Sequence, residues 1–163
     1  MGVRNCAEIG ENLHIIVERL MANQNLLKLL YYTDKDPLSQ PDFQVNQINS
    51  TFFEKLIKVV PRVGPKETAT SLIAIRVASG IRDSSNTNFR VIEISVEVFC
   101  PLTQWIIKDT NLRPFKIMGE VQQSLNGKKI NGLGTITGGD FELNFLSDEI
   151  SCYQQEFFIT TYD

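Results

Sequence analysis

The clearest hydrophobic pattern lies near the start of the chain. Between Ile9 and Met21, apolar residues recur at the three- and four-residue spacing of one helical face. Asn5 with Glu8 three residues later resembles a capping box, in which each side chain satisfies a free backbone N–H at the helix start. The apolar spacing continues through a run of leucines to Tyr31 or Tyr32. The pattern predicts an N-terminal helix within residues 1–33.

The next segment, residues 34–66, has a different character. The run TDKDPLSQPD brings prolines and aspartates together, which is typical of an exposed connection. A weaker helical pattern follows at about residues 42–56. In KVVPRVGP, Pro61 and Pro65 make any strand short and place it at a sheet edge, because proline cannot donate to a strand ladder.

From residue 68 to residue 101 the hydrophobic period changes to two. One face of residues 90–100 is apolar, whereas the other carries mainly polar residues, which predicts a half-buried antiparallel strand. The preceding run SLIAIRVA is expected to pair with it across a polar loop, giving a long hairpin with a projecting tip. The apolar face comprises Ile92, Ile94, Val96, Val98 and Cys100, and the opposite face Val91, Glu93, Ser95 and Glu97.

The rest of the chain predicts a second helix and further strands. Pro101 ends the hairpin, and a helix is expected at residues 112–125, with Pro114 tolerated in its first turn and Asn126-Gly127 ending it. Its expected buried stripe is Phe115, Met118, Val121 and Leu125, with Ile117 beside it. Three extended runs close the chain: KINGLGTIT, FELNFL and CYQQEFFITTY.

These elements predict one domain, residues 1–163, of the α+β class. We expect an antiparallel or mixed β-sheet with a long hairpin, packed by the N-terminal helix and by the second helix near 112–125. Residues 34–66 form the proline-containing connection, and residues 68–162 the sheet and helix core. A chain of 163 residues with 42% hydrophobic residues suits a single soluble domain.

Composition excludes several classes of partner. The net charge of −3 gives no reason to expect sequence-specific binding of nucleic acid. No apolar run approaches the roughly 18 residues that span a bilayer, and acids and Asn interrupt the N-terminus, so neither a membrane anchor nor a signal peptide is expected. Cys6, Cys100 and Cys152 are predicted to be free thiols in a reducing compartment.

No motif predicts catalysis, a cofactor or a metal. His14 is the only histidine and lies in the first helix without a neighbouring nucleophile, and Cys100 and Cys152 fit packing positions within strands. The glycines of GLGTITGG lie between extended segments, which favours a turn or bulge over a phosphate loop. Asp34, Asp36 and Asp42 lack calcium-loop spacing. We therefore expect a structural or interaction protein rather than an enzyme.

Charge is distributed unevenly. Residues 55–90 carry seven basic residues and two acids, whereas residues 140–163 carry six acids and no base. These segments are either two solvated surfaces, which could also pair within one monomer, or the two sides of a head-to-tail contact between identical subunits. For the second case the candidate subunit interface is Arg82, Arg90, Glu149 and Glu156. The hairpin tip, a candidate partner-binding loop, is Asp83, Ser84, Ser85, Asn86, Thr87 and Asn88.

The second half of the chain resembles a known family. The strings VEVFCP at 96–101, LRPFKIMGEV at 112–121 and LNGKKINGLG at 125–134, with Trp105 between the first two, occur in an order similar to that of tail-terminator-type neck proteins of tailed bacteriophages. The closing SDEISCYQQEFFI is similar to that family's final strand pair. The resemblance covers residues 68–162 and rests on packing and turn motifs.

The resemblance implies a structural virion protein with no catalytic residue and no cofactor. Its copies would form a ring, expected to be a hexamer, that caps the tail-tube protein and meets the head-side connector protein. Such a ring would be part of the virion and assembled in the host bacterial cytoplasm. The longer proline-containing segment departs from the family, so a tail-completion or head–tail joining protein is a neighbouring interpretation.

Two further classes remain open. A monomeric protein-interaction adaptor would differ from a ring subunit in its solution mass. A small ligand-binding domain or enzyme would show a closed pocket between helix and sheet, with perturbed carboxylates.

Overall fold

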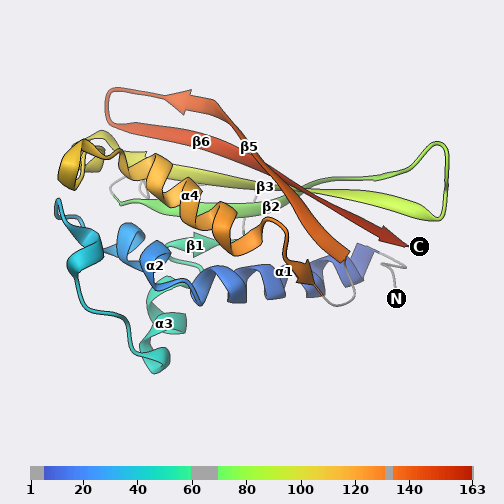
Figure 1. The fold of residues 1–163 in the computed structure, drawn as a ribbon, viewed down its shortest axis with the longest axis horizontal. Helices are drawn as coiled ribbons and strands as arrows, with labels where there is room; N and C mark the ends of the chain where they lie inside the picture. Colours follow the sequence, from blue (N-terminus) through green and yellow to red (C-terminus); the bar gives the residue numbers. More distant parts are fainter. Residues whose placement is uncertain (1–5, 60–69, 131–133, 163) are drawn as a thin grey trace.

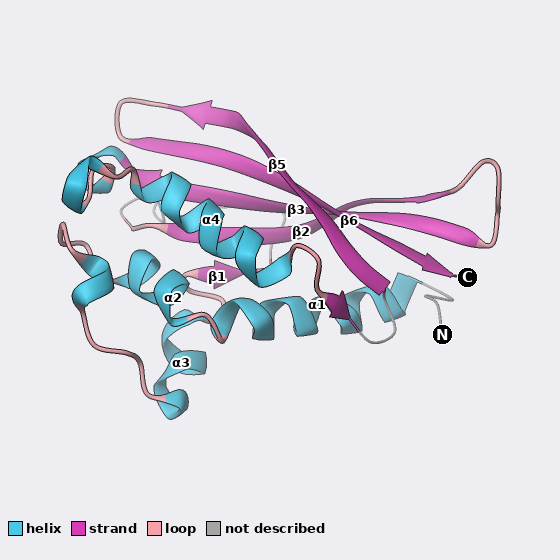
Figure 2. Ribbon diagram, viewed as in Figure 1, coloured by secondary structure: helices cyan, strands magenta, loops and turns pink. Residues whose placement is uncertain are grey.

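The computed structural model describes residues 6–59, 70–130 and 134–162, and its main feature is one six-stranded sheet with the helices on one face (Figures 1 and 2). The strand order is β1-β2-β3-β6-β5-β4. β1 runs parallel to β2, and every other pairing is antiparallel, so the sheet is mixed. The predicted α+β class is confirmed. The strands are β1 Ile57–Lys58, β2 Leu72–Arg82, β3 Phe89–Pro101, β4 Lys129–Ile130, β5 Gly134–Leu146 and β6 Ile150–Tyr162.

Helices α1, α2 and α3 precede β1 in sequence, and α4 lies between β3 and β4. The α-helices are α1 Cys6–Met21, α2 Gln24–Tyr31, α3 Val45–Phe52 and α4 Arg113–Leu125. Short 3₁₀ helices occur at η1 Pro37–Ser39, η3 Leu102–Gln104 and η4 Lys108–Thr110. The helices bury their apolar sides against one face of the sheet, and the resulting core runs continuously from the leucines of α2 to Phe157 and Ile159 of β6.

The N-terminal helix is two helices, so the expectation of one continuous helix is wrong. The helical conformation is interrupted between Met21 and Gln24. There Asn23 caps α2, because its side chain accepts a hydrogen bond from the Leu26 amide at 3.1 Å. The amide group of Asn23 also donates to Glu120 and Ser124 of α4. A polar residue inside an apolar pattern therefore ends one helix and starts the next. Asn5 of the expected capping box lies outside the described residues.

The connection folds more compactly than its composition suggests. The weak helical pattern forms α3, which is shorter than the predicted 42–56. Tyr31, Tyr32, Phe43 and Phe52 pack in one aromatic cluster, with the Phe43 and Phe52 ring centroids 4.8 Å apart. β1 is a two-residue edge strand that includes only Lys58 of KVVPRVGP, the segment for which a short edge strand was predicted. Pro61 and Pro65 lie outside the described residues.

The long hairpin is confirmed. β2 pairs with β3 from Leu72↔Phe99 to Arg82↔Arg90, and the predicted apolar face of β3 is buried under the helices. The opposite face is not simply solvated: Ser95 is 0% and Glu97 6% exposed. β3 is an inner strand, and the Glu97 carboxylate accepts hydrogen bonds from Arg76 of β2 and, at 3.0 Å, from Asn144 of β5. Donors on the neighbouring strands thus replace the water that would hydrogen-bond the Glu97 carboxylate if its strand were exposed.

The last two strands differ from the predicted short runs. GTIT and FELNFL form a single strand, β5, which continues through an irregularity at Gly138 and Gly139. Both glycines have positive φ, 121° and 108°, so the predicted bulge is confirmed. In α4 the expected stripe is buried except for Phe115, which is exposed, while Arg113 and Pro114 are buried in its place.

Candidate interaction surfaces

The candidate interface residues lie in three separate places of one chain. Arg82 and Arg90 are directly opposite one another on β2 and β3, at the end of the hairpin that projects from the sheet (Figure 1). Glu149 lies in the turn between β5 and β6 at the other end of the molecule (Figure 1), where its carbonyl oxygen accepts from the Leu102 amide at 2.8 Å. Glu156 lies within β6, between Ser95 of β3 and Asp140 of β5.

The hairpin tip has its own hydrogen bonds. The Asp83 carboxylate accepts from the backbone amides of Ser85 and Asn86, at 2.7 and 3.0 Å, and from the Ser85 hydroxyl. The hydrogen bond from the Ser85 side chain lowers the pKa of Asp83 most strongly, and the two amides lower it further. The Asn86 carbonyl oxygen accepts from the Phe89 amide at 2.9 Å. The projecting loop is therefore closed by local contacts and presents polar side chains.

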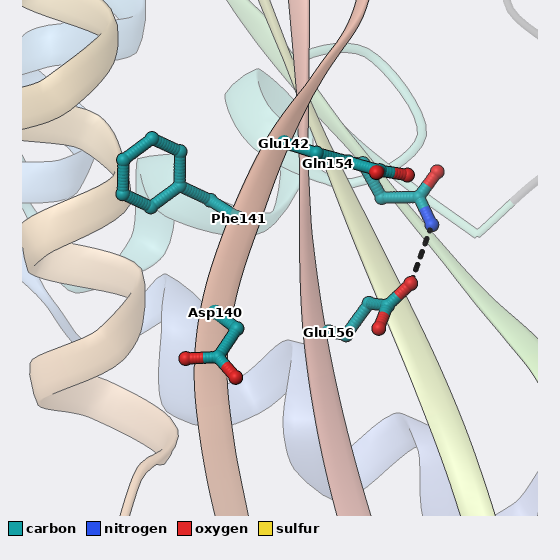
Figure 3. A pocket seen from close by; sticks show the side chains of 5 residues that line it. All are labelled: Asp140, Phe141, Glu142, Gln154 and Glu156. Atoms are coloured by element: carbon teal, nitrogen blue, oxygen red, sulfur yellow. Dashed lines mark hydrogen bonds between the residues drawn. The ribbon is translucent and has the colours of Figure 1, made fainter.

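An acidic surface lies on the paired strands β5 and β6, where Asp140 is opposite Glu156 and Glu142 is opposite Gln154. A shallow pocket of about 130 Å³ is lined by Asp140, Phe141, Glu142, Gln154 and Glu156. Gln154 donates to a carboxylate oxygen of Glu156 at 3.3 Å, and Phe141 lies on the α4 side of β5, away from these groups (Figure 3). Among the described residues no three histidine, cysteine or acidic side chains are grouped so as to hold a metal ion. The pocket is an electronegative surface formed by residues of the acidic segment.

A second surface joins aromatic side chains from α4, β5 and β6. The ring of Phe115 lies 5.7 Å from that of Phe141 and 5.2 Å from that of Tyr153, and Trp105 lies 6.1 Å from Tyr153. Phe115 and Phe141 are both exposed. The sequence reasoning missed this aromatic surface, because it expected Phe115 to be buried. The alternation of apolar and polar residues in FELNFL could have indicated this surface, since one face of a strand near the edge of a sheet can remain uncovered.

The residues considered for chemistry lie apart from these surfaces. His14 is on the exposed side of α1, where its Nε2 lies 3.0 Å from a carboxylate oxygen of Glu18. Burial raises the pKa of the Cys100 thiol to about 11 and that of the Cys152 thiol to about 12, so both are protonated at neutral pH. Ser71 contacts Cys100 at 3.7 Å. Both thiols occupy packing positions in the sheet, as predicted.

A hollow larger than the acidic pocket lies between α1 and α3. It has a volume of about 640 Å³, and its lining mixes apolar with polar side chains. Exposed Val45 and half-buried Ile48 form the α3 side. The lining residues are His14, Glu18, Met21, Ala22, Gln24, Val45, Ile48 and Asn49.

Comparison with known proteins gives one family. A family model described as YomW matches residues 23–155, most of the chain. YomW is a protein name of SPbeta-type prophage origin, which is consistent with a phage source. No curated protein matches the sequence.

No helix in the described part of the chain is both long enough and apolar enough to cross a bilayer.

Proposed function

Because the chain belongs to the YomW family, we propose that it is a structural virion protein of the phage neck. In this role it is a ring-forming tail terminator, which caps the tail tube and joins it to the head-side connector protein. Copies of the chain, six in the expected ring, assemble in the host bacterial cytoplasm and remain in the virion. The phage-derived family name supports the phage part of this proposal, and the molecular surfaces support the ring.

The observation that carries the proposal is the separation of opposite charges. Arg82 and Arg90 lie together at the projecting end of the hairpin. The carboxylates of Asp140, Glu142 and Glu156 lie along β5 and β6. Glu149 directly precedes Ile150, which pairs with Pro101 at the end of β3 far from the hairpin tip. Two complementary surfaces at different places on one subunit allow head-to-tail contacts, which close into a ring when the rotation between subunits permits.

The positions of the resemblance motifs are also compatible with this role. VEVFCP forms the end of β3, Trp105 follows, and Arg113-Pro114 opens α4. The order strand, tryptophan and helix opening with Arg-Pro is the order on which the resemblance to tail terminators rests. These residues pack within the subunit, so they support the fold of a neck subunit. Contacts between subunits are inferred from the charged surfaces.

The deciding experiment mixes the purified chain with purified tail tubes. We expect electron microscopy to show tubes with closed, capped ends, and light scattering to show the chain shifting from monomer to ring as its concentration rises. Tubes that remain uncapped, together with a chain that stays monomeric at every concentration, would contradict the terminator role. A monomeric interaction adaptor would then be the better description.

A further inference from the structure

The outer edge of β5 is open along most of its length. β4 pairs only with Gly134 and Thr135, and the backbone of Gly127 and Lys128 pairs with Ile136. From residue 137 to residue 146, no strand in the described part of the chain pairs with this edge. An open strand edge presents unpaired backbone N–H and C=O groups, which are a template for another strand.

This edge carries two irregularities, between Gly138 and Asp140 and between Leu143 and Phe145, but it lacks other usual protections against pairing. Natural sheets guard open edges with lysine, proline or very short strands. Residues 137–146 contain no proline and no basic residue, and four of their large apolar side chains are half or more exposed. The four are Phe141, Leu143, Phe145 and Leu146. A long, open and apolar edge is a surface suited to being covered by a partner strand.

The opposite side of the same sheet offers such a strand. β1 pairs only with Ile73 and Ala74 of β2, and no other described strand lies outside β2 beyond that point. Residues 79–82 of β2 belong to the projecting hairpin, and Ile81 is 66% exposed. Ile81 of β2 pairs with Val91 of β3. Phe145 of β5 pairs with Cys152 of β6, and Cys152 in turn pairs with Phe99 of β3. Val91 and Phe99 point to the same face of β3, so Ile81 and Phe145 share one face of the sheet.

Charge selects between the possible pairings. Two β5 edges placed together would bring Asp140 and Glu142 of one copy against the same residues of the other, and like charges across strands are destabilising. Two hairpins placed together would likewise bring Arg82 and Arg90 against their counterparts. Pairing of β5 with the hairpin of another copy brings acidic and basic surfaces together. Because this contact uses two different surfaces, it can repeat around a ring.

We propose that the β5 edge, residues 137–146, receives the outer edge of residues 79–82 of β2 from a second copy of this chain. The sheet then continues from one subunit to the next, with Phe145 of one copy and Ile81 of the next on the same face. The inference rests on the proposed function in that both require identical subunits to associate. It goes further by assigning the contact to two strand edges.

Disulfide trapping tests this contact in the full-length chain. Ile81→Cys and Phe145→Cys are made as separate variants in a Cys6→Ser background. The buried thiols of Cys100 and Cys152, with pKa values of about 11 and about 12, remain unreactive. Glu142→Cys gives a second position on the face of Phe145, whereas Leu143→Cys places the thiol on the opposite face and is the matched control.

We expect Ile81→Cys, mixed with whichever of Phe145→Cys and Glu142→Cys lies opposite it in the pairing register, to yield a disulfide-linked product at twice the 18.5 kDa mass of the chain. Neither variant alone, nor Leu143→Cys with Ile81→Cys, should yield it, because a disulfide requires Cβ atoms within about 4.5 Å. Capped tubes or rings without this product would overturn the strand pairing and leave the terminator role standing. Crosslinking of Phe145→Cys alone would overturn it in favour of β5–β5 contact. The product without any capping of tubes would support the strand pairing and contradict the terminator role.

Discussion

The guanidinium of Arg113 donates a hydrogen bond to the carbonyl oxygen of Leu29 at 2.7 Å, across a sequence separation of 84 residues. Arg113 is fully buried, and its other hydrogen bonds go to the carbonyl oxygens of Tyr32, Asp34 and Gln104. Leu29 belongs to the last turn of α2, where carbonyl oxygens have no helical partner and cations are favoured. One side chain thus holds the end of α2, the following loop and the start of α4 together.

Arg113→Met should therefore lower the free energy of unfolding by about 3 kcal/mol or more, because several buried carbonyl oxygens lose their donor. Arg113→Lys should restore little of it, since an ammonium group cannot reproduce the planar fork. Urea unfolding measures both. The matched control is Arg19→Met, which removes an exposed bond of 2.7 Å to the Lys129 carbonyl oxygen and should cost less than about 1 kcal/mol. Equal losses in the two methionine variants would contradict the role of Arg113.

Local periodicity was sufficient to predict most of the fold. The hairpin, α4 and the face of β6 that carries Phe157 and Ile159 follow from spacing alone, because one buried face imposes its period on the sequence. The break at Asn23 did not follow, because the leucines on both sides keep a helical spacing. What fixes the break is the contact of Asn23 with Glu120 and Ser124, almost a hundred residues away.

The surfaces were predictable only in part. The charge of each segment is a property of the sequence, so the acidic and basic regions could be identified in advance. Their placement depends on strand order, which brings Glu156 beside Asp140 and sets Arg82 opposite Arg90. Exposure of Phe115 and Phe141 depends on where α4 stops covering β5, which is a tertiary property. The open edge of β5 likewise appears only once the pairing of β4 is known.

Gly138 is expected to be indispensable to β5. Its φ is 121°, and a Cβ atom at this position would lie 2.5 Å from the carbonyl oxygen of Glu156. Gly138→Ala should lower the free energy of unfolding by roughly 2 kcal/mol or more, through strain and displacement of the β6 backbone. The matched control is Gly119→Ala in α4, where nothing lies within 4 Å; it should raise the free energy of unfolding by about 0.5–1 kcal/mol. Thermal and urea unfolding of both variants measure the difference, and a neutral Gly138→Ala would count against the bulge geometry.

The buried thiols should make stability fall at alkaline pH. Burial raises the pKa of Cys100 from its ordinary value of 9.0 to about 11, so above pH 9 the unfolded state loses this proton while the folded state keeps it. The free energy of unfolding then declines as the pH rises from about 9 to about 11. Cys100→Ala should decline less steeply over this range. Urea unfolding at several pH values compares the two slopes, and identical slopes would contradict a protonated, buried thiol.

The loop at residues 83–88 should be mobile in free subunits and become ordered when a partner binds. The local structure that the loop has in the free chain depends on the Asp83 carboxylate, which accepts hydrogen bonds from the N–H groups of Ser85 and Asn86. Asp83→Ala should therefore speed amide exchange at these two residues. Because hydrogen bonding lowers the pKa of Asp83, the effect of the carboxylate is present above its ordinary pKa of 3.8 and is lost as the pH falls through the lowered value.

Hydrogen exchange with and without tail tubes measures both parts of this prediction. Asp148→Ala, in the exposed turn between β5 and β6, is the control and should leave the exchange of Ser85 unchanged. Exchange in residues 83–88 that is equally slow in the free and the assembled chain would rule out ordering by a partner.

Charge reversal should weaken assembly and a second reversal should partly restore it. Arg82→Glu with Arg90→Glu makes two residues that lie opposite one another on β2 and β3 acidic in place of basic. Exposed ion pairs contribute only about 0–1 kcal/mol each, so charge should set orientation while apolar contacts hold the subunits together. Adding Glu149→Lys and Glu156→Lys to the same chain recreates opposite charges across the contact with the two surfaces exchanged.

Light scattering and electron microscopy with tail tubes measure the three proteins side by side. Assembly of the native chain should weaken as salt rises, because the Debye length falls from about 10 Å at 0.1 M to about 3 Å at 1 M. The double reversal should assemble weakly at low salt, and the fourfold reversal should recover part of the loss. Recovery distinguishes a contact between the two surfaces from general damage to the fold. If the substitutions only damaged the fold, the fourfold variant would assemble less well than the double variant. A fourfold variant that assembles no better than the double variant would mean that these charges do not face one another between subunits.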